Sequence, residues 1–218
     1  MSRFLSMLMM LVGCSLLAAQ DEEKLKSGPK VGTFMPAPFE CLNVNGPAKG
    51  RPHCLVCKFA LHPTVMIFAT EPADGKDEAF SDLLKKLDDT AIEFEDRGFS
   101  VGVIFLSPAA RDSTNNAGEE KTEELVKEAV NREKLVERLE KRAKDLKHVV
   151  LACHLPPGPK KYDINPKAEL TILFYERLKI LENYVFAPDK LDGKDVDRIV
   201  KRVRDELPLR KKVEEKKG

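Results

Sequence analysis

The sequence predicts an α/β domain of three layers, in which helices flank a mixed sheet of about five strands. Three observations lead to this prediction. Short apolar segments alternate with amphipathic helical segments through the middle of the chain. Two strand-like segments near the carboxyl terminus are separated by only two residues, which is typical of antiparallel neighbours. The length of 218 residues and the 42% of hydrophobic residues suit one domain with a core of its own.

The first part of the domain is predicted to be largely irregular. Residues 31–63 are rich in proline and glycine and cannot hold a long helix. One short strand fits within them, at residues 39–44. A buried strand is then expected at residues 64–70 (TVMIFAT), because this segment is short, apolar and partly β-branched.

The middle of the chain predicts parallel β–α–β units. Residues 77–94 place apolar side chains at helical spacing, and Gly98 ends this helix. Residues 100–106 form a continuous apolar run, which is typical of a parallel strand covered on both faces. A long charged helix over residues 119–146 and a third strand at 148–153 follow. The apolar stripe of the long helix consists of Leu125, Val126, Ala129, Val130, Leu135, Val136, Leu139 and Ala143.

The last part of the domain predicts a hairpin and a closing helix. Residues 170–175 and 178–186 are the two antiparallel strands. The helix spans residues 192–207, with Asp192 as its N-cap and Asp195 in the capping-box position. The predicted order of elements is therefore β, β, α, β, α, β, β, β, α.

Composition excludes several classes of function. The chain has 37 Lys and Arg residues against 36 Asp and Glu residues, a net charge of +1. This balance argues against a nucleic-acid-binding protein, because such binding needs a clustered surplus of basic residues. The sequence contains no phosphate-cradling glycine loop, dinucleotide fingerprint or metalloprotease helix, so no cofactor is predicted.

The amino terminus predicts export. After Arg3, an apolar run ends at Ala19 and is short for a membrane-spanning helix. It fits a signal peptide that is cleaved near Ala19 or Gln20, which would leave a periplasmic or secreted protein with no membrane span. Attachment of lipid at Cys14 is the alternative, because residues 11–14 resemble a bacterial lipobox. The predicted organisation is a signal peptide at 1–20, a flexible segment at 21–30, the domain at 31–207 and a charged tail at 208–218.

Three segments carry a resemblance to a known family. The segment GPKVGTFMPAPFECLNVNGPAKG looks like the start of the family domain, TVMIFATEP like its central strand, and KKYDI with LTILFYERLKILENYVF like its late hairpin. The chain thus resembles the thioredoxin-like superfamily, most closely the alkyl hydroperoxide reductase/thiol-specific antioxidant (peroxiredoxin-like) branch. The resemblance covers about residues 28–207. It implies a thioredoxin-like fold and thiol–disulfide chemistry.

The chain departs from this family at the usual active site. In the family, the reactive cysteine follows the central strand at the start of a helix, whose dipole lowers the thiol pKa. The corresponding segment here, ATEPADGKDEAF, contains no cysteine. The family's cis-proline before the Thr-initiated strand is also missing, since Ala168, Glu169 and Leu170 precede Thr171.

Cys54 and Cys57 remain as a candidate catalytic pair. Their spacing closes a small disulfide ring, and the neighbouring Arg51, His53 and Lys58 would favour a thiolate. The pair precedes the central strand, so it would lie opposite the usual active-site end of the sheet unless the loop folds back across the sheet edge. One hypothesis is therefore an exported thiol–disulfide oxidoreductase with a protein thiol or disulfide as its partner.

Two other interpretations of the same cysteines stay open. In a non-catalytic binding or structural module, a structural disulfide joins Cys54 to Cys57, or joins one of them to Cys41 or Cys153. In a metal site, His53, Cys54, Cys57 and His62 would bind zinc or copper(I), with Cys153 and His154 as a second cluster. A bonded and exposed pair would favour redox chemistry, whereas a buried bond would favour a structural role.

Overall fold

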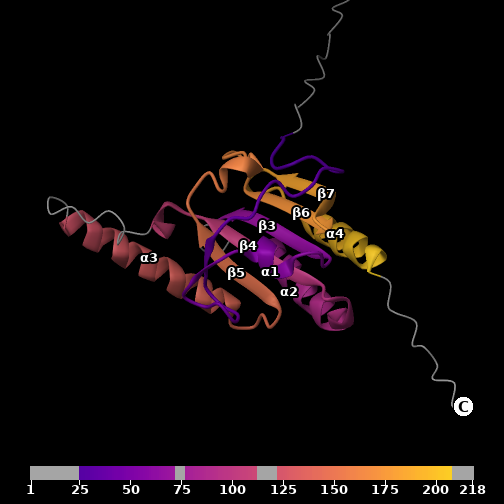
Figure 1. The fold of residues 1–218 in the computed structure, drawn as a ribbon, viewed down its shortest axis with the longest axis horizontal. Helices are drawn as coiled ribbons and strands as arrows, with labels where there is room; N and C mark the ends of the chain where they lie inside the picture. Colours follow the sequence, from indigo (N-terminus) through magenta and orange to yellow (C-terminus); the bar gives the residue numbers. More distant parts are fainter. Residues whose placement is uncertain (1–24, 72–76, 112–121, 208–218) are drawn as a thin grey trace, which may run out of the picture.

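A seven-stranded mixed sheet forms the centre of the computed structural model, which describes residues 25–71, 77–111 and 122–207 (Figure 1). The strand order is β2-β1-β5-β4-β3-β6-β7. The strands are β1 (Cys41–Asn43), β2 (Pro52–His53), β3 (Thr64–Thr70), β4 (Ser100–Leu106), β5 (Val149–His154), β6 (Leu170–Glu176) and β7 (Lys179–Phe186). β3, β4 and β5 are parallel, and the other pairings are antiparallel. The predicted mixed sheet is confirmed, with seven strands rather than about five.

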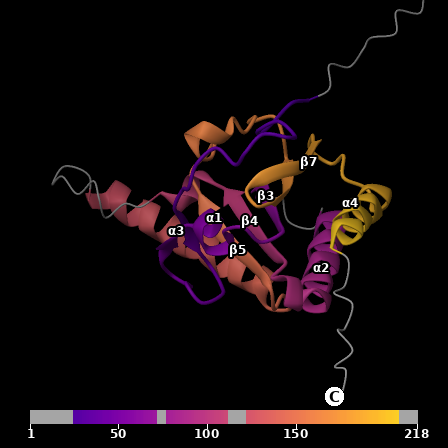
Figure 2. The ribbon, with the colours of Figure 1, turned by 45° about the vertical axis from the view of Figure 1, so that its right-hand side comes forward.

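Helices cover both faces of this sheet. They are α1 (Leu55–Phe59), α2 (Glu78–Glu93), α3 (Thr122–Ala143) and α4 (Gly193–Glu206), with short 3-10 helices at Glu95–Arg97, Pro108–Ala110 and Lys160–Tyr162. α2, α3 and α4 share one buried cluster with one face of the sheet, and α1 packs on the other face. Figure 2 shows α2 beside α4. No helix in the described part of the chain is long and apolar enough to cross a membrane.

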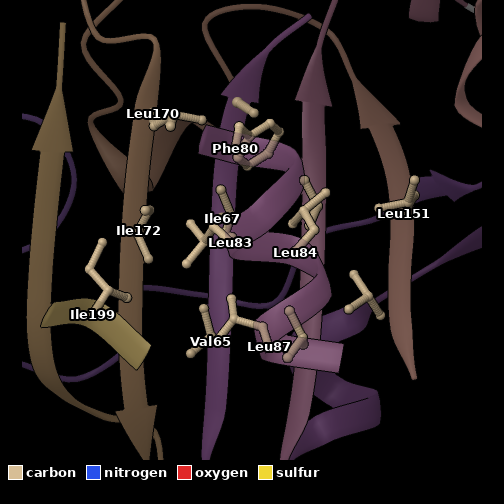
Figure 3. Close-up of a cluster of buried hydrophobic side chains, with 14 of the residues drawn as sticks. Val65, Ile67, Phe80, Leu83, Leu84, Leu87, Leu151, Leu170, Ile172 and Ile199 are labelled. Carbon is tan, nitrogen blue, oxygen red and sulfur yellow. The ribbon is translucent and has the colours of Figure 1, made fainter. Parts of the chain in front are cut away.

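The larger core lies between the sheet and α2. Leu83 and Leu87 of α2 point toward Val65 and Ile67 of β3 (Figure 3), and all four side chains are fully buried. Alternate residues of β3 face the other side, where Met66 is equally buried. Because both faces are covered, the strand is apolar along almost its whole length, as the sequence predicted.

The smaller core lies beneath α1, a helix that the sequence did not predict. Leu55, Val56 and Phe59 are buried there. Gly102, in the middle of β4, permits the close approach. A Cβ atom at this position would lie 3.0 Å from Cε2 of Phe59 and 3.1 Å from Cδ1 of Leu55. α1 therefore rests directly on the backbone of the sheet.

The buried side chains of α3 all lie in its second half. Leu135, Leu139 and Ala143 are buried, but Val126 and Val130 are 58% and 40% exposed. The predicted stripe is therefore wrong for the first half of the helix, which extends beyond the sheet (Figure 1). The 22 residues of α3 span about 33 Å. The six residues of β5, on which α3 packs, span only about 20 Å.

The ordered domain begins earlier than predicted. Within the expected flexible segment 21–30, Ser27 is 5% exposed and its Oγ lies 2.6 Å from Oγ1 of Thr171. Nδ2 of Asn183 donates a hydrogen bond to the carbonyl oxygen of Ser27. This segment is thus tied to the hairpin of β6 and β7. The predicted signal peptide and charged tail lie outside the described residues.

The closing helix follows the prediction closely. The Asp192 side chain accepts a 2.8 Å hydrogen bond from the backbone N–H of Asp195, which satisfies one of the free donors at the start of α4. Elsewhere, the first strand is shorter than the predicted residues 39–44, and β5 ends one residue later than predicted.

Candidate functional site

The Cys54–Cys57 pair lies at the carboxyl-terminal end of the parallel strands. In the antiparallel pairings at this edge, Leu42 is the partner of Cys153 and Cys41 is the partner of His53. The end of β2 is therefore level with the end of β5, and Cys54 follows directly. The loop after β1 has folded back across the sheet edge, so the pair occupies the end where parallel α/β sheets carry their sites.

The two cysteines form a disulfide at the start of α1. Cys57 is exposed and Cys54 is half-buried. Cys54 is the N-cap residue of α1, and its Sγ accepts a 3.1 Å hydrogen bond from the backbone N–H of Cys57. The pair is thus bonded and reachable from solvent through Cys57, which is the arrangement that favours redox chemistry.

Basic residues flank the disulfide in the sequence. Arg51 and Lys58 are exposed, and Nζ of Lys58 lies 5.7 Å from the centre of the Phe59 ring. Partial burial lowers the pKa of Lys58. His53 is half-buried, and its Nδ1 has no hydrogen-bond partner among the described residues. The hydrogen bond to the Cys54 sulfur therefore comes from the backbone N–H of Cys57. The cationic side chains of Arg51 and Lys58 are close to Cys54 and Cys57 in the sequence.

Cys41 and Cys153 are free, buried thiols. Sγ of Cys41 donates to the carbonyl oxygen of His53 at 3.4 Å. Burial raises the pKa of Cys41 to about 12 and that of Cys153 to about 11. Both therefore stay protonated at neutral pH and are poor nucleophiles. Neither is bonded to Cys54 or Cys57, so the structure does not contain the longer-range disulfides considered above.

The structure does not gather the predicted metal ligands. Cys54 and Cys57 are bonded to each other, and His62 lies beyond the far end of α1, against Gly98. Cys153 belongs to the core on the opposite face of the sheet from α1. Within residues 25–71, 77–111 and 122–207, no group of three or more His, Cys, Asp or Glu side chains is arranged to hold a metal ion.

Ion pairs join α3 to Glu71 and Asp77, the residues on either side of the segment in which the family keeps its reactive thiol. Nε and Nη2 of Arg138 donate to the two carboxylate oxygens of Glu71 at 2.6 and 3.0 Å. Arg142 pairs with Asp77, which precedes α2. The sequence does not predict this arrangement, because nothing in either segment indicates a contact across more than 60 residues.

Comparisons with known proteins identify the fold. No protein-family model and no curated protein matches the sequence. A solved structure of a candidate protein disulfide isomerase from Bacteroides thetaiotaomicron is similar, with 12% identity and a TM-score of 0.54 over 84% of this chain and 94% of that one. An uncharacterized conserved protein from Geobacillus kaustophilus has 16% identity and a TM-score of 0.50 over 84% and 87%. A thiol peroxidase from Chromobacterium violaceum has 14% identity and a TM-score of 0.47 over 83% and 90%.

The chain has the thioredoxin-like fold, as its sequence predicted. At such low identity the fold is what these proteins share with it. The chemistry has to be argued from the site, since one fold supports many functions.

Proposed function

We propose that this protein is a thiol–disulfide exchange protein that uses Cys54 and Cys57 as its redox pair. The observation that carries the proposal is the position of the disulfide. It is exposed through Cys57 and lies at the functional end of a thioredoxin-like sheet. The partner is a second protein that carries a dithiol or a disulfide.

The difference in exposure assigns a role to each sulfur. A thiolate of the partner reaches Sγ of the exposed Cys57, forms a mixed disulfide with it and breaks the bond to Cys54. Cys54 leaves as a thiolate that accepts a hydrogen bond from the backbone N–H of Cys57. The partner's second thiolate then attacks its own sulfur in the mixed disulfide and releases Cys57. The partner's dithiol is oxidised to a disulfide, and the pair gains two electrons and two protons.

The reverse sequence oxidises the pair. In that direction Cys57 attacks the partner's disulfide and Cys54 resolves the mixed disulfide. Each cysteine therefore keeps one role in both directions.

A non-catalytic module is the second candidate function. Its support is that Cys54 packs against the smaller core and caps α1, so the disulfide also ties the N-cap of this short helix to its middle residue. In this case no exchange partner is needed, and the only role of the disulfide is to stabilise the folded protein.

The variant Cys54→Ser/Cys57→Ser separates the two candidates. Chain-entropy arguments assign about 2 kcal/mol to a ring closed over so few residues, against about 3 kcal/mol for a loop of ~15 residues. We expect the variant to lose exchange with a dithiol, measured by insulin reduction, while its melting temperature falls by about 4–8 °C at most. The matched control is Cys153→Ala, which should keep exchange. If the wild type shows no exchange with any common dithiol reductant, the proposed exchange function is refuted and only the assignment of the fold stands.

Single variants test the assigned order of attack. Cys54→Ser leaves the exposed Cys57, so a partner thiol should accumulate as a mixed disulfide that mass spectrometry detects. Cys57→Ser should trap much less, because Cys54 is half-buried. Equal trapping by the two variants would contradict the assignment.

We also propose that the protein is exported through the signal peptide at residues 1–20. The support is the apolar run that ends at Ala19. The intact mass of protein from the cell envelope should correspond to a chain that begins near Gln20 or Asp21. A diacylglyceryl-modified chain beginning at Cys14 would instead show lipid anchoring, and a full-length cytosolic chain would exclude export.

A further inference from the structure

An open groove lies at the same end of the sheet as the disulfide. It has a volume of about 560 Å³ and is lined by residues 37–39 and 154–162. Clefts of roughly 300–1,000 Å³ are typical of ligand sites. The exchange reaction proposed above uses none of these residues.

The floor of the groove is aromatic and rigid. The rings of Phe39 and Tyr162 lie edge to face with their centres 5.1 Å apart, and the His154 ring meets Phe39 at 6.1 Å. Tyr162 is fully buried, and its hydroxyl donates a 2.6 Å hydrogen bond to the carbonyl oxygen of Ala37. This bond fixes the two lining segments to each other, so the groove is already formed before a ligand arrives.

The wall of the groove is apolar and its rim is basic. Leu155 is 37% exposed, and the prolines that follow it at 156, 157 and 159 add apolar surface without N–H donors. Lys160 and Lys161 are exposed and form no ion pair within the described part of the chain. The lining contains no carboxylate. The groove therefore complements a ligand that joins an apolar group to a negative charge.

The groove and the disulfide share one face of the sheet. Phe39 and Cys54 both pack against the smaller core beneath α1. Cys41, two residues after Phe39, is the strand partner of His53, which immediately precedes Cys54. The groove and the disulfide therefore lie on the same face and at the same end of the sheet.

We propose that this groove binds an extended, acidic and apolar polypeptide segment of the exchange partner. An apolar side chain of that segment packs on Phe39 and Leu155, and a carboxylate lies at Lys160 and Lys161. Naming the exchange partner as the ligand rests on the proposed function, but binding itself needs neither sulfur. The groove sets which proteins present their thiols to Cys57.

The absence of tryptophan from the chain makes a direct binding experiment available. The probe is a short peptide with one tryptophan between glutamates and with serine in place of cysteine, so that no exchange takes place. We expect saturable binding with a blue shift of the peptide fluorescence. The variant Lys160→Glu/Lys161→Glu should weaken binding by about tenfold or more through like-charge repulsion. The matched control Lys190→Glu changes an exposed lysine outside the groove and should bind as the wild type does.

Further arms of the experiment separate the alternatives. Leu155→Ser should weaken binding several-fold, and a peptide with lysines in place of the glutamates should bind the wild type weakly. Unchanged affinity in the double lysine variant would overturn the proposal. So would binding of a fatty acid such as dodecanoate, with the same dependence on these residues, when the peptide does not bind.

The experiment distinguishes a wrong binding proposal for the groove from a wrong exchange proposal for the disulfide. Cys54→Ser/Cys57→Ser should bind the peptide like the wild type. Peptide binding without any exchange activity would support the groove as a binding site and refute the redox role. Exchange activity without peptide binding would support the redox role and refute the proposal that the groove binds a polypeptide.

Discussion

Removal of the Asp88 side chain should uncouple α2 from the start of β5. Asp88 lies on α2 and is 5% exposed. Its Oδ1 accepts hydrogen bonds from the backbone N–H groups of Lys147, His148 and Val149 at 3.0, 2.7 and 3.0 Å. Its Oδ2 accepts from Lys147 at 3.1 Å. One carboxylate thus satisfies three successive N–H groups where the chain turns from α3 into β5.

The expected cost of Asp88→Ala is about 3 kcal/mol. Hydrogen bonds to a charged group contribute roughly 1.5–3 kcal/mol each, and a buried donor left unsatisfied adds its desolvation penalty. Water can replace the bonds to Lys147 and His148, which are both at least partly exposed, but Val149 is 1% exposed. The estimate therefore corresponds to the loss at Val149 plus part of the other two. For a domain of this size the melting temperature should fall by about 6–12 °C.

Urea unfolding followed by far-UV circular dichroism measures this loss, since the chain has no tryptophan for fluorescence. The matched control is Asp89→Ala, which removes the adjacent, exposed carboxylate of the same helix and should change stability by no more than ~0.5 kcal/mol. Hydrogen exchange should show faster exchange at the N–H of Val149 in the Asp88 variant. A folded Asp88→Ala protein within ~1 kcal/mol of the wild type would refute the reasoning.

Two further predictions concern α1 and the buried thiols. Gly102→Val should lower the free energy of unfolding by about 1–3 kcal/mol, because the new side chain meets α1. The control Gly193→Ala adds a methyl group in open space and should be tolerated. Urea unfolding of both variants tests this prediction. Burial raises the pKa of Cys41 to about 12 and of Cys153 to about 11, above the ordinary 9.0. The stability contributed by the neutral thiols is therefore fully present below pH 9 and lost as the pH rises through 11 and 12. Alkaline unfolding should be less steep in Cys41→Ala/Cys153→Ala, and an identical pH dependence would contradict this assignment.

Most of the fold could be predicted because its signals are local. The strands at residues 64–70 and 100–106 and the N-cap at Asp192 follow from side-chain patterns within one segment. α1 could not be predicted in this way, since its five residues are too few to show a helical period. Isolated helices of this length are unstable, and this one depends on tertiary packing above Gly102.

The place of the candidate site depended on contacts that are remote in sequence. Cys54 and Cys57 could be chosen from their spacing and neighbours. Which end of the sheet they occupy was decided by the pairing of Leu42 with Cys153, more than 100 residues away. No segment of the sequence contains that information, so the fold-back of the loop remained only one of two arrangements. The groove at residues 154–162 was also missed, because a proline-rich loop looks the same whether or not it encloses a cavity.

The described cysteines of this thioredoxin-like chain all lie away from the family's usual active-site position. At the end of β3, Arg138 of α3 pairs with Glu71 on the α2 side of the sheet. α1 brings Cys54 and Cys57 to the same end of the sheet on the opposite side. The other cysteines of the described residues are buried, with raised pKa values. Within that part of the chain, any exchange with a partner must therefore pass through the Cys54–Cys57 disulfide, on the face that also carries the groove.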